Sequence, residues 1–245
     1  MTIDVFFSPV EVDEALLEGR TAVVIDVIRA TSCIVEAIAN GARGIFPTIH
    51  PENAIKLASD LGREDTLLCG ERKGLKIEGF DLGNSPGEFT PDVVGGKQLV
   101  MSTTNGTRAL LAVEDASRVL AASFMNLSSV ARALNETEEL VVVCAGRQDR
   151  FSLDDALCAG VLIQKVLAGR KSEPLLDVEP VLNDGARVVL DLAEKYTPDE
   201  SFLRTTLAGK ALEGIELDGD LALCASVDRH DLVAEMKERR IGLVG

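Results

Sequence analysis

Short runs of Val, Ile, Leu and Ala alternate along the chain with segments in which apolar residues recur every three or four positions. The first pattern predicts buried strands and the second predicts amphipathic helices. The predicted strands span residues 3–7, 21–26, 67–69, 98–102, 118–122 and 140–144. The predicted helices span residues 10–17, 32–40, 52–61, 106–113, 127–134, 153–167, 182–195 and 199–213, and a last helix begins at His230. This alternation indicates an α/β protein with a three-layer α/β/α architecture and a mostly parallel or mixed sheet.

The same pattern indicates how the chain is organised. We interpret residues 1–245 as one domain, in which the order strand, arginine loop, helix occurs twice and suggests two similar halves, about 1–135 and 136–245. Residues 70–96 form a long stretch rich in Gly and Pro, and irregular segments of this length are often functional. The helical segment 174–213 either caps a site or decorates an edge of the sheet, and both interpretations stay open.

Composition narrows the class of partner. The chain is 46% hydrophobic and lacks Trp, so its core must be aliphatic. Lys and Arg total 25 against 40 Asp and Glu, which gives a formal net charge of −15. Such a surface repels nucleic acids and anionic membranes, so we expect neither as a partner. A small anionic substrate would need a local cluster of basic residues to overcome the same repulsion.

The cysteines and the apolar runs indicate in which cellular compartment the protein is found. The five cysteines include no C-x-x-C pair and lie mostly in apolar segments, as expected of buried thiols in a reducing environment. The first residues lack the basic segment of a signal peptide, and no apolar run approaches about 18 residues. We therefore expect a cytoplasmic protein that does not enter a membrane.

An arginine follows shortly after three of the predicted strands, at Arg29, Arg72 and Arg147. In α/β proteins, ligands bind at the carboxyl ends of the strands. A guanidinium group grips phosphate, sulfonate or carboxylate with two parallel hydrogen bonds. We therefore predict that the three arginines converge on one multiply charged anion. The alternative is three unrelated surface arginines, each paired with a local acid.

Two aspartates, like the arginines, lie at or after the ends of predicted buried strands and are candidates for a metal site. Asp26 ends a buried strand, where it can hold Mg²⁺ beside a helix that binds phosphate oxygens. The alternative is that Asp26 caps the turn and pairs with Arg29, although Thr31 or Ser32 can serve as the N-cap. Farther along, Ser152 and Asp155 fit a capping box, which leaves Asp154 as the better candidate to face a metal.

Two loops carry the remaining candidate residues. Thr103, Thr104, Asn105 and Gly106 lie between a strand and a helix and can cradle an oxyanion, although Asn-Gly is also a common turn. The long stretch 70–96 contributes Glu71, Asn84 and Ser85, which are polar residues of a kind that turns also use.

Cys144 and Arg150 fit the C-x5-R spacing of cysteine-dependent phosphatases. Against this interpretation, the residue after Arg150 is Phe151 rather than Ser or Thr, and the thiol ends an apolar run. Burial in such a run raises the pKa of a thiol and makes it a poor nucleophile. We therefore favour a packing role for Cys144.

Several blocks together resemble the 2-phosphosulfolactate phosphatase (ComB-like) family. They are Asp-Val-Ile-Arg-Ala-Thr-Ser (26–32), Gly-Glu-Arg-Lys-Gly (70–74), Gly-Phe-Asp-Leu-Gly-Asn-Ser-Pro-Gly-Glu (79–88), Thr-Thr-Asn-Gly-Thr (103–107), Cys-Ala-Gly-Arg (144–147) and the Asp154-Asp155 pair ahead of Ala159-Gly160. The resemblance implies an α/β/α fold peculiar to this family. It also implies an Mg²⁺-dependent acid phosphatase that converts 2-phospho-3-sulfolactate to sulfolactate and phosphate, a step associated with coenzyme M biosynthesis.

The resulting candidate site combines metal-binding and substrate-binding residues. The catalytic candidates are Asp26 and Asp154. The metal-binding candidates are Asp26, Glu71, Asp154 and Asp155. The substrate-binding candidates are Arg29, Thr31, Ser32, Arg72, Asn84, Ser85, Thr103, Thr104, Asn105, Gly106 and Arg147.

Two alternatives to this function remain open at the level of sequence. The chain could hydrolyse another small phosphorylated hydroxy acid, or it could bind small sulfonated or phosphorylated acids without catalysis, which would need the arginines but not the carboxylates. The sequence also leaves open whether water attacks directly or a phospho-enzyme forms, and whether the protein is a homodimer.

Overall fold

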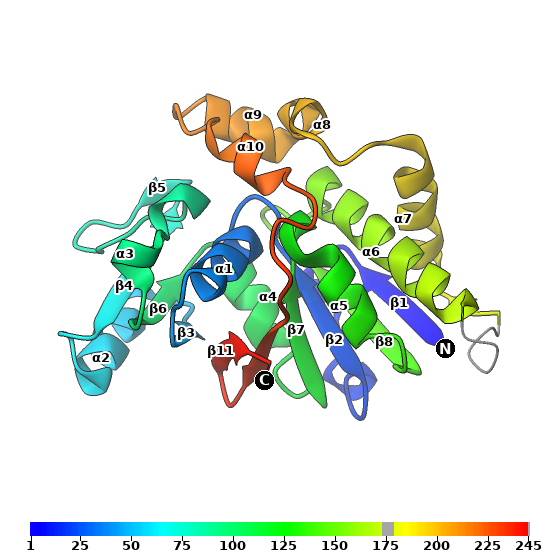
Figure 1. Ribbon diagram of the computed structural model, residues 1–245, viewed down its shortest axis with the longest axis horizontal. Coiled ribbons are helices and arrows are strands. Elements are labelled where there is room, and N and C mark those ends of the chain that lie inside the picture. Colours follow the sequence, from blue (N-terminus) through cyan, green and yellow to red (C-terminus); the bar gives the residue numbers. More distant parts are fainter. Residues whose placement is uncertain (173–178, 245) are drawn as a thin grey trace.

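A mixed sheet of eleven strands runs through the computed structural model, which describes residues 1–172 and 179–244 (Figure 1). The strands are β1 (Thr2–Phe6), β2 (Thr21–Ile25), β3 (Gly44–Pro47), β4 (Thr66–Arg72), β5 (Leu75–Lys76), β6 (Gln98–Ser102), β7 (Arg118–Ala122), β8 (Glu139–Cys144), β9 (Val181–Leu182), β10 (Ala234–Lys237) and β11 (Arg240–Leu243). Their spatial order is β5-β4-β6-β3-β11-β10-β7-β2-β8-β1-β9.

Helices connect and cover these strands. The helices are α1 (Ala30–Ala39), α2 (Pro51–Leu61), α3 (Pro91–Val94), α4 (Gly106–Ala112), α5 (Leu127–Ala133), α6 (Leu153–Lys171), α7 (Asp184–Lys195), α8 (Glu200–Thr205), α9 (Leu207–Glu213) and α10 (Asp220–Cys224). Short 3₁₀ turns lie at Pro9–Glu11, Glu14–Leu16, Pro86–Glu88 and Phe124–Asn126.

The sheet consists of two parallel blocks joined by an antiparallel hairpin. In one block β7, β2, β8 and β1 are parallel, and in the other β4, β6 and β3 are parallel. The hairpin β10–β11 lies between them and pairs antiparallel with β7 on one side and with β3 on the other. Helix α4 packs against β2 of one block and β3 of the other, so its N-terminus lies where the blocks meet.

Strand alternation divides the core into two layers. Along β2, Val23 and Ile25 pack into one cluster of buried side chains, whereas Ala22 and Val24 pack into the other. Successive side chains of a strand point to opposite faces, so a strand that is apolar at every position must be covered on both. The predicted three-layer α/β/α architecture with a mixed, mostly parallel sheet is therefore confirmed.

Several details of the sequence prediction are wrong. Residues 10–17 form two short 3₁₀ turns instead of one helix, and strand β3 was missed. The segment 199–213 forms two helices, α8 and α9, rather than one. The last helix, expected from His230, is instead the hairpin β10–β11.

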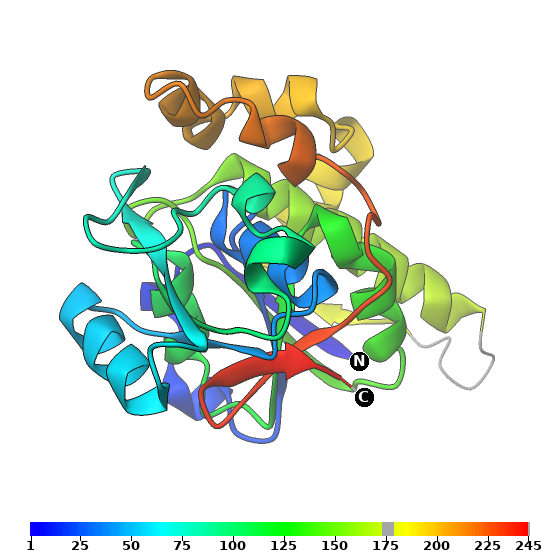
Figure 2. The ribbon, with the colours of Figure 1, turned by 60° about the vertical axis from the view of Figure 1, so that its left-hand side comes forward.

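The helices α8, α9 and α10 form a cap. In both views they lie above the part of the sheet at which β2 ends (Figures 1 and 2). Because α9 also contributes side chains to a cavity at that edge, the predicted segment 174–213 includes a cap over the site. Residues 174–178 of that segment lie outside the described residues.

The sheet also bears on the suggested halves of the chain. Strand β8 lies between β2 and β1, so residues from both proposed halves share one parallel block. The boundary near residue 135 therefore does not separate two bodies in space, and the similarity of the halves stays a prediction. In the part of the chain that the structure describes, helices are too short or too polar to cross a membrane.

Candidate active site

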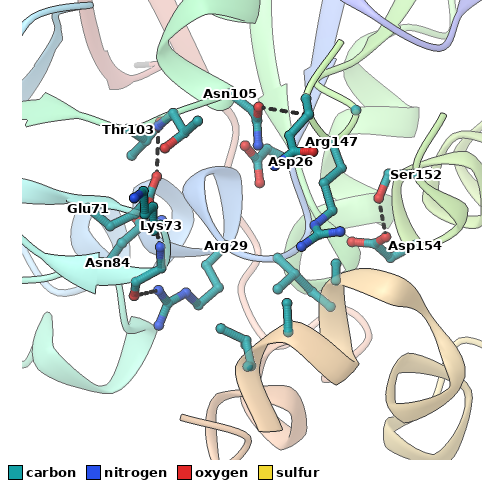
Figure 3. A pocket seen from close by; sticks show the side chains of 18 of the residues that line it. Asp26, Arg29, Glu71, Lys73, Asn84, Thr103, Asn105, Arg147, Ser152 and Asp154 are labelled. Carbon is teal, nitrogen blue, oxygen red and sulfur yellow. Dashed lines mark hydrogen bonds between the residues drawn. The ribbon is translucent and has the colours of Figure 1, made fainter. Parts of the chain in front are cut away.

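A cavity of about 230 Å³ lies between the loops that follow the strands and the cap (Figure 3). Its walls come from the loops after β2, β4, β6 and β8, from the long loop after β5, from the start of α6, and from α9 with Ile215 just after it. The lining residues are Asp26, Ile28, Arg29, Glu71, Lys73, Gly74, Asn84, Thr103, Thr104, Asn105, Gly146, Arg147, Gln148, Ser152, Asp154, Asp155, Ala208, Ala211, Leu212 and Ile215.

Asp26 lies at the centre of this set, immediately after β2. Its Oδ1 accepts a hydrogen bond from the Ala30 N–H at 3.2 Å, so the carboxylate caps the first turn of α1. Burial raises the pKa of Asp26 to about 7, and the neighbouring carboxylates of Asp154 and Glu71 add to the rise. Of the alternative interpretation, the capping role of Asp26 is thus present, whereas a pairing with Arg29 is absent from the described hydrogen bonds and salt bridges, because Arg29 is bound elsewhere.

Gly106 brings a helix close to Asp26. A Cβ atom at this position would lie 2.4 Å from the Cβ of Ala30 and 2.7 Å from Oδ2 of Asp26. Only a residue without a side chain permits this approach. Gly106 does not itself line the cavity, so its contribution is to let the start of α4 approach the carboxylate.

Thr31 and Ser32 do not reach the cavity. The Thr31 hydroxyl donates to the Asp26 carbonyl at 2.8 Å and accepts from the Asp26 N–H at 3.0 Å. The Ser32 hydroxyl donates to the Val27 carbonyl at 2.8 Å. Both side chains therefore fix the backbone of the β2–α1 loop, and the structure does not bring them to a substrate. Since Asp26 makes the cap contact with Ala30, neither is the N-cap that the sequence suggested.

Glu71 connects two loops at the cavity. Its Oε1 accepts from the Thr104 N–H and its Oε2 accepts from the Gly74 N–H, both at 2.7 Å. These bonds hold the β4–β5 turn against the loop after β6. The side chain is buried and lines the cavity, as the sequence predicts.

Arg72 does not line the cavity. Its guanidinium donates to the carbonyls of Glu71, Ser102 and Ile49 and to the Ser102 hydroxyl, at 2.7–3.1 Å. Because neighbouring residues of a strand point to opposite faces, Glu71 and Arg72 cannot both face one site. The predicted convergence of three arginines is therefore wrong at Arg72. The adjacent Lys73 lines the cavity in its place.

Arg29 lines the cavity but is tied to other groups. Its Nη1 donates to Asp220 Oδ2 at 2.7 Å and to Ser85 Oγ at 3.1 Å, and its Nη2 donates to the Gly74 carbonyl at 2.6 Å. Ser85 also donates to Asp220 at 2.7 Å and does not line the cavity. Arg29 is thus a buried cation that joins the cap to the β4–β5 turn.

Arg147 is the better placed of the two remaining arginines. It lies in the loop after β8, and Figure 3 shows its guanidinium pointing into the space between Asp26, Asp154 and the cap. Among the described residues, its side chain has no hydrogen-bond or salt-bridge partner, and the same holds for Lys73. These two cations are therefore available to a bound anion.

The adjacent acids Asp154 and Asp155 differ in role. Asp154 lines the cavity and accepts from the Ser152 hydroxyl at 2.6 Å, whereas both oxygens of Asp155 accept backbone N–H groups, from Val27 at 2.9 Å and Gly146 at 3.1 Å. Burial raises the pKa of both carboxyl groups. The predicted capping box between Ser152 and Asp155 is wrong, because Asp155 instead ties the loop after β2 to the loop after β8.

The loop after β6 contributes in part. Thr103, Thr104 and Asn105 line the cavity, but Thr103 is also occupied by reciprocal hydrogen bonds with Thr107. Asn105 Oδ1 lies 3.4 Å from the Gln148 N–H. Thr104 and Asn105 are therefore the polar groups of this loop that are best placed to meet a ligand.

Asn84 is a buried residue of the long loop that lines the cavity. Its Oδ1 has no hydrogen-bond partner among the described residues. An unpartnered buried oxygen is costly unless something else supplies the missing contact. A cation, a bound water or a donor on a ligand would satisfy it.

Sequence reasoning missed several of the lining residues. Lys73 lies two residues after Glu71 in sequence. Because side chains of a strand alternate between its two faces, Lys73 should have been preferred to Arg72 as the residue that shares the side of Glu71. The cap residues Ala208, Ala211, Leu212 and Ile215 carry no local signal, because small apolar side chains on a short helix are common everywhere.

Cys144 is fully buried, and burial raises its pKa well above the usual value for a thiol. It does not line the cavity. We therefore expect Cys144→Ser to keep kcat within about twofold of wild type and to lose about 1 kcal/mol of stability. Phosphate release and urea unfolding would check this, and a folded Cys144→Ser protein without turnover would establish the thiol as the nucleophile.

The side-chain groups of the cavity that could bind a metal ion are carboxylate and amide oxygen atoms. Within residues 1–172 and 179–244, no three His, Cys, Asp or Glu side chains form a group that could hold a metal ion by themselves. The cavity nevertheless offers carboxylates from Asp26 and Asp154 and the unpartnered Asn84 oxygen. Such a set fits Mg²⁺, which is usually bound by one or two carboxylates together with water and substrate phosphate.

Comparisons with known proteins agree on one family. The family model described as 2-phosphosulpholactate phosphatase matches residues 6–239. A protein of Clostridium perfringens named probable 2-phosphosulfolactate phosphatase is 40% identical over 100% of this chain and 97% of its own length. Proteins of the same name from Clostridium acetobutylicum (45% identical, 96% of this chain and 97% of the relative) and Thermotoga petrophila (39% identical, 86% and 87%) are also similar.

Proposed function

The chain belongs to the 2-phosphosulpholactate phosphatase family, and from its site we propose that it hydrolyses 2-phospho-3-sulfolactate to 3-sulfolactate and phosphate. Members of this family are phosphoric monoester hydrolases. The observation that carries the proposal is that Arg147 and Lys73, two cations whose side chains have no partner among the described residues, line the same small cavity as buried carboxylates. Such an arrangement suits a ligand that is strongly anionic and also needs a metal.

The charges of the cavity support a bound cation. Its lining includes the carboxylates of Asp26, Glu71, Asp154 and Asp155 but only three basic side chains, of which Arg29 is already paired. A substrate that carries phosphate, sulfonate and carboxylate groups would be repelled by these acids. We propose that Asp26 and Asp154 hold Mg²⁺, which would neutralise the acids and polarise the phosphoryl group.

The protein side chains supply binding and charge stabilisation. Arg147 would grip the phosphoryl group with its planar guanidinium, and Lys73 would neutralise a second anionic group of the substrate. Negative charge that develops on the phosphoryl oxygens would meet Arg147 and the polar groups of Thr104 and Asn105. In the net reaction, water adds across the phosphorus–ester oxygen bond, the phosphoryl group leaves as phosphate, and the ester oxygen leaves as the hydroxyl of sulfolactate.

The decisive assay is phosphate release from a panel of small phosphomonoesters, with 2-phosphosulfolactate, phospholactate and phosphoglycerate as members. The proposal requires that 2-phosphosulfolactate has the highest kcat/KM. Higher activity on phospholactate or phosphoglycerate would favour another small hydroxy acid as substrate. Binding of all these acids without any phosphate release would favour the non-catalytic binder.

Removal of divalent cations is expected to abolish turnover. We expect EDTA to lower kcat by at least about 100-fold, and added Mg²⁺ to restore it, because buried acids that face an anionic substrate must be neutralised. The control is calcium-saturated EDTA, which should have no such effect. Full activity after exhaustive chelation would contradict the metal assignment while leaving phosphatase activity itself intact.

A further inference from the structure

One wall of the cavity is apolar and comes from the cap. Ala208, Ala211 and Leu212 of α9, together with Ile215 just after it, all line the cavity. Their spacing of three to four residues places them on one face of the helix. Figure 3 shows a cap helix bordering the cavity on the side opposite Thr103.

Two contacts hold this wall in place. A Cβ atom at Gly74 would lie only 2.7 Å from Cδ1 of Ile215, so the end of α9 is close to the backbone of the β4–β5 turn. Asp220 of α10 forms a salt bridge of 2.7 Å with Arg29, which is buried. The cap is therefore attached next to the β4–β5 turn through an apolar contact and through an ion pair, and Arg29 also donates to the Gly74 carbonyl at 2.6 Å.

The space that remains beneath the wall is small. The cavity volume of about 230 Å³ is below the roughly 300–1,000 Å³ of typical small-molecule pockets. Its opposite side is polar, with Asp26, Glu71, Thr104 and Asn105. A short chain with several charged groups suits a small space with one polar side and one apolar wall.

We propose that the cavity-facing side of α9, with Ile215, determines substrate size and restricts the site to phosphomonoesters of short acids. This inference rests on the proposed phosphatase function and adds the residues that limit its substrates. Ile215 and Ala211 are the side chains whose size sets the limit. Removing bulk at Ile215 opens the site to larger esters, and adding bulk at Ala211 closes it to small ones.

The first test compares Ile215→Ala with a matched control on the neighbouring helix α9. Leu207 belongs to α9 but is 71% exposed and does not line the cavity, so Leu207→Ala removes apolar bulk without changing the site. We expect Ile215→Ala to raise the ratio of kcat/KM for 1-naphthyl phosphate, whose fused rings are bulkier than the sulfolactate chain, to that for 2-phosphosulfolactate by about tenfold, and Leu207→Ala to leave it unchanged. An unchanged ratio in Ile215→Ala would overturn the proposal.

The second test reduces the cavity. We expect Ala211→Leu to raise KM for 2-phosphosulfolactate by about tenfold, while calorimetry shows an unchanged Kd for inorganic phosphate, which needs no space beneath α9. Unchanged phosphate affinity also shows that the variant is folded. A wild-type KM in Ala211→Leu would contradict a role of α9 in substrate size.

Failure of the proposed function has a different signature. If the wild type releases no phosphate from any ester, the proposed phosphatase function is wrong. The limit that α9 sets on ligand size is then measured from binding affinities alone. Ile215→Ala is then expected to bind 1-naphthyl phosphate about tenfold more tightly than wild type, with equal affinity for inorganic phosphate. Equal affinities for both ligands would reject the size limit independently of catalysis.

Discussion

Asp26→Asn is expected to lower kcat/KM by about 10³-fold in a protein that remains folded. The carboxylate lies at the centre of the cavity, and the amide would remove the negative charge that we propose to hold Mg²⁺. Asn keeps an oxygen that can accept the Ala30 N–H, so the cap of α1 survives. Phosphate release at saturating Mg²⁺ measures the loss, and turnover near the wild-type rate would show that Asp26 is not part of the catalytic machinery.

Stability measurements separate a chemical role of Asp26 from a structural one. Burial raises the pKa of Asp26 from its ordinary value of 3.8 to about 7. The neutral form is thus favoured in the folded protein, and its stabilising effect is fully present below pH 3.8 and lost as pH rises through about 7. Without divalent ions, Asp26→Asn should therefore unfold at higher urea concentration than wild type at pH 8, and the difference should shrink at pH 5. A less stable Asp26→Asn protein at pH 8 would point to a structural role.

Arg147→Ala is expected to lower kcat/KM by about 100-fold, with Arg147→Lys intermediate. Arg147 is the arginine of the site whose guanidinium has no partner among the described residues, so a bound anion would gain both of its hydrogen bonds. Lysine keeps the charge but cannot form the two parallel bonds. If Arg147 binds the phosphoryl group, the loss should appear mainly in kcat, and if it binds the sulfonate or carboxylate, mainly in KM.

Arg150 provides the matched control for this prediction. It lies three residues away in the same loop, is exposed, and does not line the cavity. Arg150→Ala removes the same charge and should leave kcat/KM within about twofold of wild type. Equal losses in Arg147→Ala and Arg150→Ala would indicate a general effect of net charge rather than a binding contact.

The regular part of the fold could be predicted from sequence because its central strands, such as β2 and β8, are apolar at every position but the first. Such runs must be covered on both faces, which dictates three layers. The hairpin β10–β11 could not be predicted in the same way. Its turn residues Glu238 and Arg239 both have positive φ, a conformation that usually signals itself through Asn or Gly. Charged residues at these positions made the segment resemble the end of a helix.

Site residues could be predicted where they directly follow the end of a buried strand. The prediction failed where the direction of the side chain decided whether a residue faces the cavity. Asp26 and Arg147 follow buried strands and lie at the cavity as predicted. Arg72 was assigned to the site with its neighbour Glu71, although strand alternation separates them. A cap was one of two interpretations of segment 174–213, but the contact that holds it could not be predicted, because Arg29 and Asp220 are 191 residues apart in sequence.

The proposed metal and substrate positions can be tested in a crystal structure with Mn²⁺, sulfolactate and phosphate, since Mn²⁺ replaces Mg²⁺ and can be located by its anomalous scattering. We expect one ion bound by Asp26 and Asp154, with phosphate on the same ion and held by Arg147, and sulfolactate beneath α9. An ion bound away from Asp26, or phosphate and sulfolactate bound outside the cavity, would contradict this expectation.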